Sequence, residues 1–225
     1  MSKTSSSTLH VSNAGTAARF LTAALSLSDH SYEVHGDDAM ELRPLCGITK
    51  PFEKLGVSFD FFKKSHAIPY KVYGKSKLRE KANYLEIPGE KSSQFLSAFM
   101  MLGPLFKTGL SLSYCSEMVS FPYVIMTKKL MEHFGAVIKE DKGFFYIEGT
   151  SYKESSYRIE LDYSSASYFL VLAAIHGEEV FLPGAIKESL QGDVEIVSLL
   201  EKMGCHATWN KKGLALKGPK KLLPL

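Results

Sequence analysis

The order of apolar and polar positions repeats three times along the chain. Each copy opens with small residues and continues as an apolar helical run that contains a Phe-Leu pair, at 15–21, 92–96 and 164–170. The pairs begin at Phe20, Phe95 and Phe169, at intervals of 75 and 74 residues. Because order and spacing both recur, the pattern predicts a true internal repeat rather than a chance likeness of three α/β segments.

Each copy predicts the same series of elements. A second helical run ends 35 to 40 residues after the Phe-Leu pair at a glycine, the usual helix stop: Gly56, Gly135 and Gly204. The next 14 to 18 residues alternate around a turn, as a β-hairpin does, and end in Gly74, Gly149 and Gly218. Short β-like stretches lie between the two helices, at 31–35, 110–114 and 179–182, and before the first helix, at 9–11, 84–87 and 157–161. The sequence therefore predicts an α/β fold of repeated βαβαββ units.

Length and composition are those of an ordinary globular protein. The 225 residues, 45% of them hydrophobic, can form one large core or two smaller ones. No apolar run reaches the roughly 18 residues that a membrane span requires, and residues 1–8 lack the pattern of a secretory signal. Three cysteines without C-x-x-C spacing argue against a disulfide framework and favour a reducing compartment, so we expect a cytoplasmic protein without a membrane partner.

Charge and histidine placement narrow the range of ligands. The net charge is only +3 and the lysines are scattered except in the tail 211–221, which predicts no nucleic-acid partner. The seven histidines are dispersed and form no H-x-x-x-H pair, which makes a metal enzyme the least favoured alternative. A mildly positive chain is compatible with small anionic ligands.

Several predicted helices begin with residues that suit an anion. A helix start has unpaired N–H groups and the positive end of the helix dipole, and Gly15, after Asn13 and before Thr16, would let a ligand approach the backbone closely. Arg43 precedes Pro44 at the next helix start, where its guanidinium could bind a carboxylate or phosphate. The matching starts in the second copy are Ser92-Ser93-Gln94 and Ser120-Phe121-Pro122-Tyr123. Each alone is more often a plain helix cap, but their combination favours an anion site.

Taken together, these motifs resemble a known family. They are Asn13-Ala14-Gly15-Thr16-Ala17-x-Arg19, Arg43-Pro44, Ser92-Ser93-Gln94-Phe95-Leu96, Ser120-x-Pro122-Tyr123, Asp162-x-Ser164-Ser165-Ala166-Ser167-Tyr168-Phe169 and Gln191-Gly192-Asp193. In this order they are similar to the 5-enolpyruvylshikimate-3-phosphate synthases, over nearly the full chain. Two departures are Phe20, where many relatives have proline, and Phe121, which replaces a commonly basic residue.

The resemblance implies an enzyme that transfers the enolpyruvyl group of phosphoenolpyruvate to the 5-hydroxyl of shikimate 3-phosphate and releases phosphate, without a metal or organic cofactor. It implies that Ser92, Ser93 and Ser120 hold shikimate 3-phosphate and that Gln94 lies between the two substrates. Gly15 and Arg43 would contact phosphoenolpyruvate. The near wall would be formed by Asn13, Thr16 and Tyr123.

The family fold implied by the resemblance has two lobes of three βαβαββ units each. Residues 1–160 would be two units of the first lobe and residues 161–225 the first unit of the second, so the architecture is expected to be incomplete. The acid and base residues of the family lie in an early Lys-Ser motif and in the later part of the second lobe, and neither motif is present here. We therefore expect the isolated chain not to catalyse, and the remainder of the enzyme to be a further partner.

Two alternatives remain open at this point. A degenerate or split half could bind an anion or a partner chain without turnover. The sister transferase that acts on a UDP-sugar shares the fold and the phosphoenolpyruvate chemistry, but not the Ser-Ser-Gln-Phe-Leu helix start.

Overall fold

The computed structural model describes residues 7–80, 84–87, 93–114 and 120–225. The chain divides into two compact units, Met1–Ser155 and Ser156–Leu225, which are considered separately below. In the described ranges no helix is long and apolar enough to cross a membrane.

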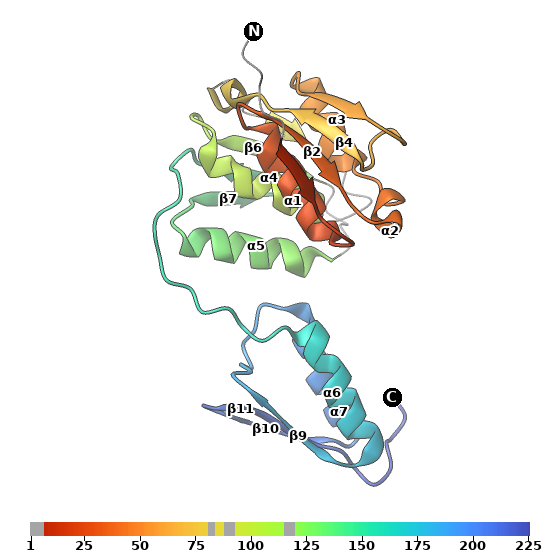
Figure 1. Ribbon diagram of the computed structural model, residues 1–225. Coiled ribbons are helices and arrows are strands. Elements are labelled where there is room, and N and C mark those ends of the chain that lie inside the picture. The colour runs from red at the N-terminus through yellow and green to blue at the C-terminus, as the bar shows by residue number, and fades with distance from the viewer. Residues whose placement is uncertain (1–6, 81–83, 88–92, 115–119) are drawn as a thin grey trace. The chain divides into compact units, whose positions relative to one another are not determined.

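The first unit contains two copies of one topology (Figure 1). The first copy comprises β1 (Ser7–His10), α1 (Gly15–Ser26), β2 (Ser31–His35), α2 (Asp38–Glu41), α3 (Cys46–Lys54), β3 (Ser58–Phe61) and β4 (Tyr70–Tyr73). A 3-10 turn, η1 (Ser76–Glu80), leads to the second copy: β5 (Tyr84–Glu86), α4 (Ser93–Leu102), η2 (Gly103–Leu105), β6 (Leu110–Ser113), α5 (Phe121–His133), β7 (Ile138–Asp141) and β8 (Phe144–Ile147). The sheets have the equivalent orders β1-β2-β4-β3 and β5-β6-β8-β7, each with one parallel pair at its start.

The second unit repeats this topology without its first strand. Its elements are α6 (Tyr163–His176), β9 (Glu179–Pro183), η3 (Gly192–Val194), α7 (Glu195–Lys202), β10 (His206–Asn210) and β11 (Gly213–Lys217), with the sheet order β10-β11-β9. The predicted repeat is thus confirmed in the order and direction of its strands.

The strand predicted at 157–161 is wrong, because the segment has no strand conformation. The end of this segment is held by hydrogen bonds from side chains, and not by backbone hydrogen bonds to a neighbouring strand. Ser189 Oγ donates to the Glu160 carboxylate at 2.6 Å, and Gln191 Nε2 donates to the Leu161 carbonyl at 2.7 Å. Alternation of apolar residues can identify an extended segment, but it does not supply a neighbouring strand.

Two sets of glycines recur at equivalent positions of the three copies. Gly56, Gly135 and Gly204 follow the second helices with φ of +85°, +85° and +96°, which confirms the predicted helix stops. The glycines that close the hairpins pack against the last turn of the first helix or the segment just after it. A Cβ on Gly74, Gly149 or Gly218 would lie 2.6, 2.1 or 2.3 Å from the carbonyl oxygen of Leu25, Phe106 or Ala173. Glycine recurs at this point because no side chain fits there.

One continuous core joins the two copies of the first unit. Helices α1 and α4 pack against each other, α3 packs on α1, and α5 packs on α4. The Phe52 and Phe99 rings contact each other across this core in a tilted arrangement, with centroids 5.1 Å apart. Gly47 makes room for Phe95, since a Cβ at that position would lie 2.3 Å from the ring. The buried Tyr70 hydroxyl is hydrogen-bonded to Thr22 at 2.6 Å, and burial raises the pKa of Tyr70.

Helix α6 of the second unit is apolar on more than one face. Leu170, Ala173 and Ala174 point into the core formed with β9, β11 and α7. Four large side chains on the other face are between 56 and 78% exposed: Tyr168, Phe169, Leu172 and Ile175. In the first unit the corresponding helices, α1 and α4, cover each other, so α6 presents the same kind of surface uncovered.

We expect Phe99→Ala to lower the free energy of unfolding of the first unit by about 3 to 5 kcal/mol, because the ring is fully buried and its loss leaves a cavity. Urea unfolding followed by far-ultraviolet circular dichroism measures this. The matched control is Phe62→Ala, which removes the same ring from a half-exposed site and should cost much less. The single tryptophan, Trp209, lies in the second unit, so its fluorescence provides an internal reference. Equal losses in the two variants would contradict the core described here.

We expect Phe169→Gln/Leu172→Gln to change stability by less than about 0.5 kcal/mol, because both side chains are exposed and glutamine is a good helix former. The same change should reduce self-association of the chain through α6, because large exposed apolar patches favour association. Sedimentation velocity over a range of concentrations measures it. Leu223→Gln, at an exposed position outside α6, is the control. A variant that associates as strongly as the unmodified chain would contradict this role for α6.

Candidate functional site

Four of the predicted site residues meet where α1 and α4 begin. Gly15 and Thr16 open α1, Gln94 is the second residue of α4, and Arg43 lies in the connection between α2 and α3. Gln94 Nε2 donates to Thr16 Oγ1 at 3.0 Å, so the first turns of α1 and α4 are joined by a side-chain hydrogen bond. Packing of α1 on α4 therefore brings together residues from both copies of the repeat.

Arg19 belongs to the same cluster, although the sequence analysis did not include it among the substrate-binding residues. Its Nη1 donates to Gln94 Oε1. A Cβ placed on Gly15 would lie 3.0 Å from Arg43 Nη1 and 3.2 Å from Arg19 Nη1, so both guanidinium groups face the open side of this glycine. The signal that could have identified Arg19 is its spacing, because a residue four positions after Gly15 lies one turn further along the same helix face.

The electrostatics of the cluster favour an anion. Burial, followed by the nearby charge of Arg43, lowers the pKa of Arg19 from its ordinary value. None of the ion pairs formed within the described ranges involves Arg19 or Arg43. Helix α1 adds its positive end, since its N-cap position, Ala14, has no side-chain bond to the helix and its first turn has no acidic residue.

The remaining predicted residues lie around these helix starts. Asn13 is exposed and precedes the N-cap residue of α1. Ser93 is the first residue of α4 and is 5% exposed, whereas Ser92 lies outside the described residues. Ser120 is the N-cap residue of α5 and has φ of +62° but makes no side-chain cap bond, and Tyr123 is in the first turn of that helix. Ser120 therefore occupies the N-cap position of α5 without a capping bond from its side chain.

The start of α6 is different, because its polar groups satisfy one another. The Asp162 carboxylate accepts from the backbone of Ser164 at 3.0 Å and from Ser165 Oγ at 2.6 Å. The Ser165 hydroxyl is the main cause that lowers the pKa of Asp162. Asp162 caps this helix by accepting from the backbone of both serines, so the start of α6 differs from that of α1, which has no side-chain cap.

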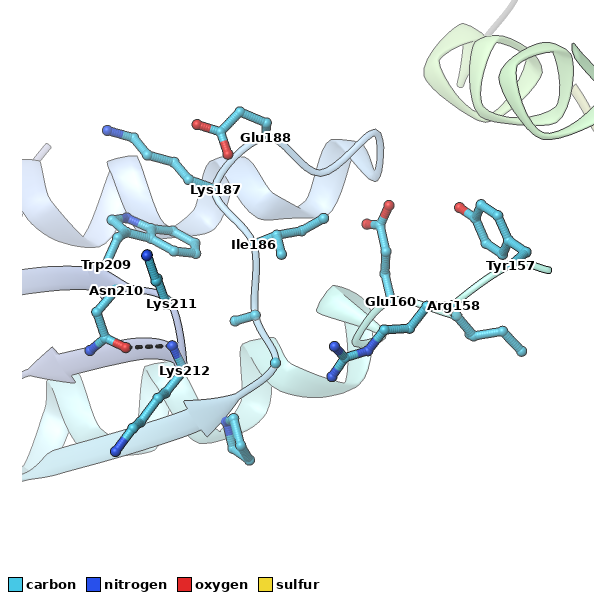
Figure 2. Close-up of a pocket in the computed structure, with 14 residues that line it drawn as sticks. Tyr157, Arg158, Glu160, Ile186, Lys187, Glu188, Trp209, Asn210, Lys211 and Lys212 are labelled. Carbon is cyan, nitrogen blue, oxygen red and sulfur yellow. Dashed lines mark hydrogen bonds between the residues drawn. The ribbon is translucent and has the colours of Figure 1, made fainter. Parts of the chain in front are cut away.

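A groove lies in the second unit (Figure 2). It is a shallow groove of about 880 Å³ whose lining includes Arg158, Lys187, Trp209, Lys211 and Lys212. Its cationic side chains are all exposed, and the Glu160 carboxylate on its wall is engaged by Ser189. No predicted site residue lines it. The groove lacks the converging, partly buried donors that distinguish the cluster at Gly15.

The described structure is therefore a repeated α/β protein in which helix starts and two arginines form a positively charged cluster. A family model for EPSP synthase (3-phosphoshikimate 1-carboxyvinyltransferase) matches residues 2–224, and the chain belongs to this family. The resemblance seen in the sequence motifs is thereby confirmed.

Similar proteins agree with this assignment. The chain is 36% identical over 217 residues to the chloroplastic 3-phosphoshikimate 1-carboxyvinyltransferase of Petunia hybrida, an alignment covering 94% of this chain and 42% of the relative. It is 38% identical over 204 residues to the 3-phosphoshikimate 1-carboxyvinyltransferase of Vibrio cholerae serotype O1. That alignment covers 89% of this chain and 47% of the relative. The EPSP synthase structure from Acinetobacter baumannii has the same fold, with a TM-score of 0.71, 22% identity, and coverage of 94% of this chain and 48% of that one. The chain thus spans less than half the length of these relatives.

We expect Gly15→Ala to weaken the binding of inorganic phosphate by about tenfold or more, because the methyl group would occupy the space between the two guanidinium groups. Stability should change by less than about 1 kcal/mol, since the higher helix propensity of alanine opposes the cost of displacing the two guanidinium groups. Isothermal titration measures affinity, and urea unfolding measures stability. Ala17→Gly, on the same helix turn, controls for altered helix propensity. Unchanged phosphate affinity in Gly15→Ala would show that anions do not bind against this glycine.

Proposed function

We propose that this chain forms the substrate-binding half of a shikimate-pathway enolpyruvyl transferase. The complete reaction protonates the methylene carbon of phosphoenolpyruvate, joins the 5-hydroxyl of shikimate 3-phosphate to the adjacent carbon, and then eliminates phosphate. The observation that carries the proposal is the convergence of Arg19, Arg43 and Gln94 at Gly15, at the junction of two repeat units. Family membership supports the reaction class.

The arrangement suits two anions on neighbouring helix starts. Arg43 and the first turn of α1 provide donors for phosphoenolpyruvate, in agreement with the contacts that the resemblance implies. Ser93 and Ser120 stand at the starts of α4 and α5, whose packing supports a shared site for shikimate 3-phosphate, and Ser92 precedes Ser93 in the sequence. Gln94 follows Ser93 and contacts Thr16 and Arg19, which fits its place between the two substrates. Asn13 and Tyr123 complete the wall of the proposed site.

The chain alone is proposed to bind without turnover, because the acid and base motifs of the family have no counterpart in its 225 residues. The missing remainder of the enzyme is the proposed partner that would supply them. The division into two first-lobe units, 1–160, and one second-lobe unit, 161–225, is likewise a proposal. Its support is the two copies that share one core and the third that has a core of its own. A cytoplasmic location is proposed from cysteine usage, although the named plant relatives are chloroplastic.

We expect shikimate 3-phosphate to bind the chain and Ser92→Ala/Ser93→Ala to weaken that binding by about tenfold or more, because two hydroxyl donors at the start of α4 are lost. Isothermal titration measures the affinity. Shikimate, which lacks the phosphate, should bind much more weakly. Ser167→Ala, which removes a hydroxyl from exposed α6, is the matched control and should have no effect.

Adding phosphoenolpyruvate to the same samples tests catalysis through phosphate release. We expect none. Turnover would contradict the assignment of essential acid and base groups to residues outside the chain, and an absence of shikimate 3-phosphate binding would contradict the proposed substrate-binding role. Binding that is equal in the double variant and the Ser167→Ala control would place the ligand elsewhere.

A further inference from the structure

We infer that Phe121 is a positioning residue of the proposed shikimate 3-phosphate site: its ring stacks on Tyr114 and holds Ser120 in a backbone conformation that leaves the serine hydroxyl for a ligand. The inference rests on the proposed function for the identity of that ligand. A phenylalanine side chain has no charge and no hydrogen-bond donor, so its effect on phosphate binding must act through a neighbouring residue.

The backbone at the start of α5 has an unusual conformation. Ser120, the N-cap residue, has φ of +62° and ψ of +35°, which is the left-handed region. This region is unfavourable for a residue with a side chain, because the Cβ atom comes close to the following carbonyl oxygen. Such a conformation persists only where the surrounding contacts hold it. The geometry of Ser120 therefore requires an anchor nearby.

The Ser120 hydroxyl is not used to cap the helix. An N-cap serine ordinarily has an extended backbone, and its oxygen accepts from the N–H group of the second or third helical residue. In α5 the second helical residue is Pro122, which has no N–H group. The third is Tyr123, whose N–H group donates to the Ser120 carbonyl oxygen at 3.1 Å. The left-handed conformation thus leaves the hydroxyl without a capping bond on an exposed residue.

The anchor is a pair of stacked rings. Phe121 is the first residue of α5, and Tyr114 directly follows β6. Their ring centroids lie 5.8 Å apart with an interplanar angle of 24°. The two rings therefore connect the end of β6 with the start of α5, whatever the course of residues 115–119, which lie outside the described part of the chain. Because Phe121 adjoins Ser120, fixing its ring restricts the backbone rotations of the serine.

Tyr114 is itself held from three sides, so it can serve as a fixed support. Its ring stacks on the fully buried Phe145 with centroids 4.9 Å apart, and its hydroxyl donates to Glu140 Oε1 at 3.2 Å. Burial, followed by the charge of Glu140, raises the pKa of Tyr114 to about 12, so the hydroxyl remains a donor at neutral pH. Lys128 of α5 donates to Glu140 Oε2 at 3.0 Å, which ties the same support to the helix that it positions.

The body of α5 is attached by other contacts. Thr127 Oγ1 donates to the Tyr123 carbonyl at 2.8 Å and is hydrogen-bonded to Ser97 Oγ of α4 at 2.9 Å. Val124 and Met131 are buried in the shared core. Loss of the Phe121 ring should therefore change the first turn of α5 while the helix stays packed on α4.

The experiment is a double-mutant cycle on the full chain with Ser120→Ala, Phe121→Ala and the two combined. Isothermal titration measures the affinity for shikimate 3-phosphate. Phe121→Tyr keeps a stacking ring, and Phe144→Ala, which removes a half-exposed ring from β8 of the same copy, is the matched control. In the ligand-free proteins, the Cα and Cβ chemical shifts of Ser120 distinguish a left-handed from an extended backbone.

We expect Ser120→Ala to weaken binding about tenfold, because a hydrogen bond to a charged phosphate is lost, and Phe121→Ala to weaken it about threefold to tenfold. The combined variant should lose no more than about tenfold, since only one hydroxyl is available to be lost, whereas independent effects would multiply to about thirtyfold or more. Phe121→Tyr and Phe144→Ala should bind as the unmodified chain. The Ser120 shifts should move toward extended values in Phe121→Ala alone among these ring variants.

Losses that multiply in the combined variant would overturn the inference, because general destabilisation does not depend on the Ser120 hydroxyl. Unchanged affinity or unchanged Ser120 shifts in Phe121→Ala would overturn it as well, and so would a loss in Phe121→Tyr as large as that in Phe121→Ala. Circular dichroism verifies the fold of each variant. If Phe121→Ala does not fold, Phe121→Leu, which keeps apolar volume but cannot stack, takes its place in the cycle.

The proposed function fails separately, through an absence of shikimate 3-phosphate binding by the unmodified chain. The Ser120 shifts then decide the inference by themselves. A move toward extended values in Phe121→Ala, absent from Phe121→Tyr, would show that the ring positions the serine for a ligand other than shikimate 3-phosphate. Shifts that do not move would reject the inference together with the proposed function.

Discussion

Packing of α1 against α4 is the contact on which the rest of the first unit depends. Each helix is the first of its repeat, and each has one face on its own sheet and another on the helix of the neighbouring copy. The contact excludes water from both apolar helices and merges two small cores into one. It also aligns the helix starts, which places Gln94 within hydrogen-bond reach of Thr16 and Arg19. The cluster at Gly15 is therefore a consequence of how the repeats pack, and neither copy contains it alone.

Glycines that the backbone geometry requires explain why the repeat could be recognised in the sequence. Glycines are required wherever a helix ends in a left-handed residue or a hairpin passes close to a helix carbonyl, and they recur at Gly56, Gly135 and Gly204 for the first reason. Strands 31–35, 110–114 and 179–182 were predicted within a residue of β2, β6 and β9, because alternation and turn residues are local signals. The segment 157–161 was not predicted correctly, since whether an extended stretch joins a sheet depends on a distant edge and on competing side chains such as Gln191.

The grouping of several predicted site residues in space agrees with the sequence, whereas their role in binding stays a prediction. Gly15, Thr16, Arg43 and Gln94 were chosen as helix-start residues and they lie in one cluster. Arg19 is part of the motif that carries the family resemblance, but it was not given a role in binding. Its importance depends on two contacts made by α4, 75 residues later, and on the position of Arg43. Neither could be inferred without knowing that the copies pack through their first helices. Ser92 lies outside the described residues, so its place remains a prediction.

The arrangement at Gly15 also shows how a fold can keep two like charges, those of Arg19 and Arg43, close together. Two unit charges about 4 Å apart repel by about 1 kcal/mol in water and about 4 kcal/mol near a protein surface, so a flexible arginine would turn away. Arg43 is exposed and can retain much of its hydration, but Arg19 is partly buried and fixed by Gln94 and Phe95. The packing energy of α1 on α4 offsets the repulsion while no anion is present. In the proposed site an anion would meet donors already in position, and relief of the repulsion between the two arginines would add to the free energy of binding.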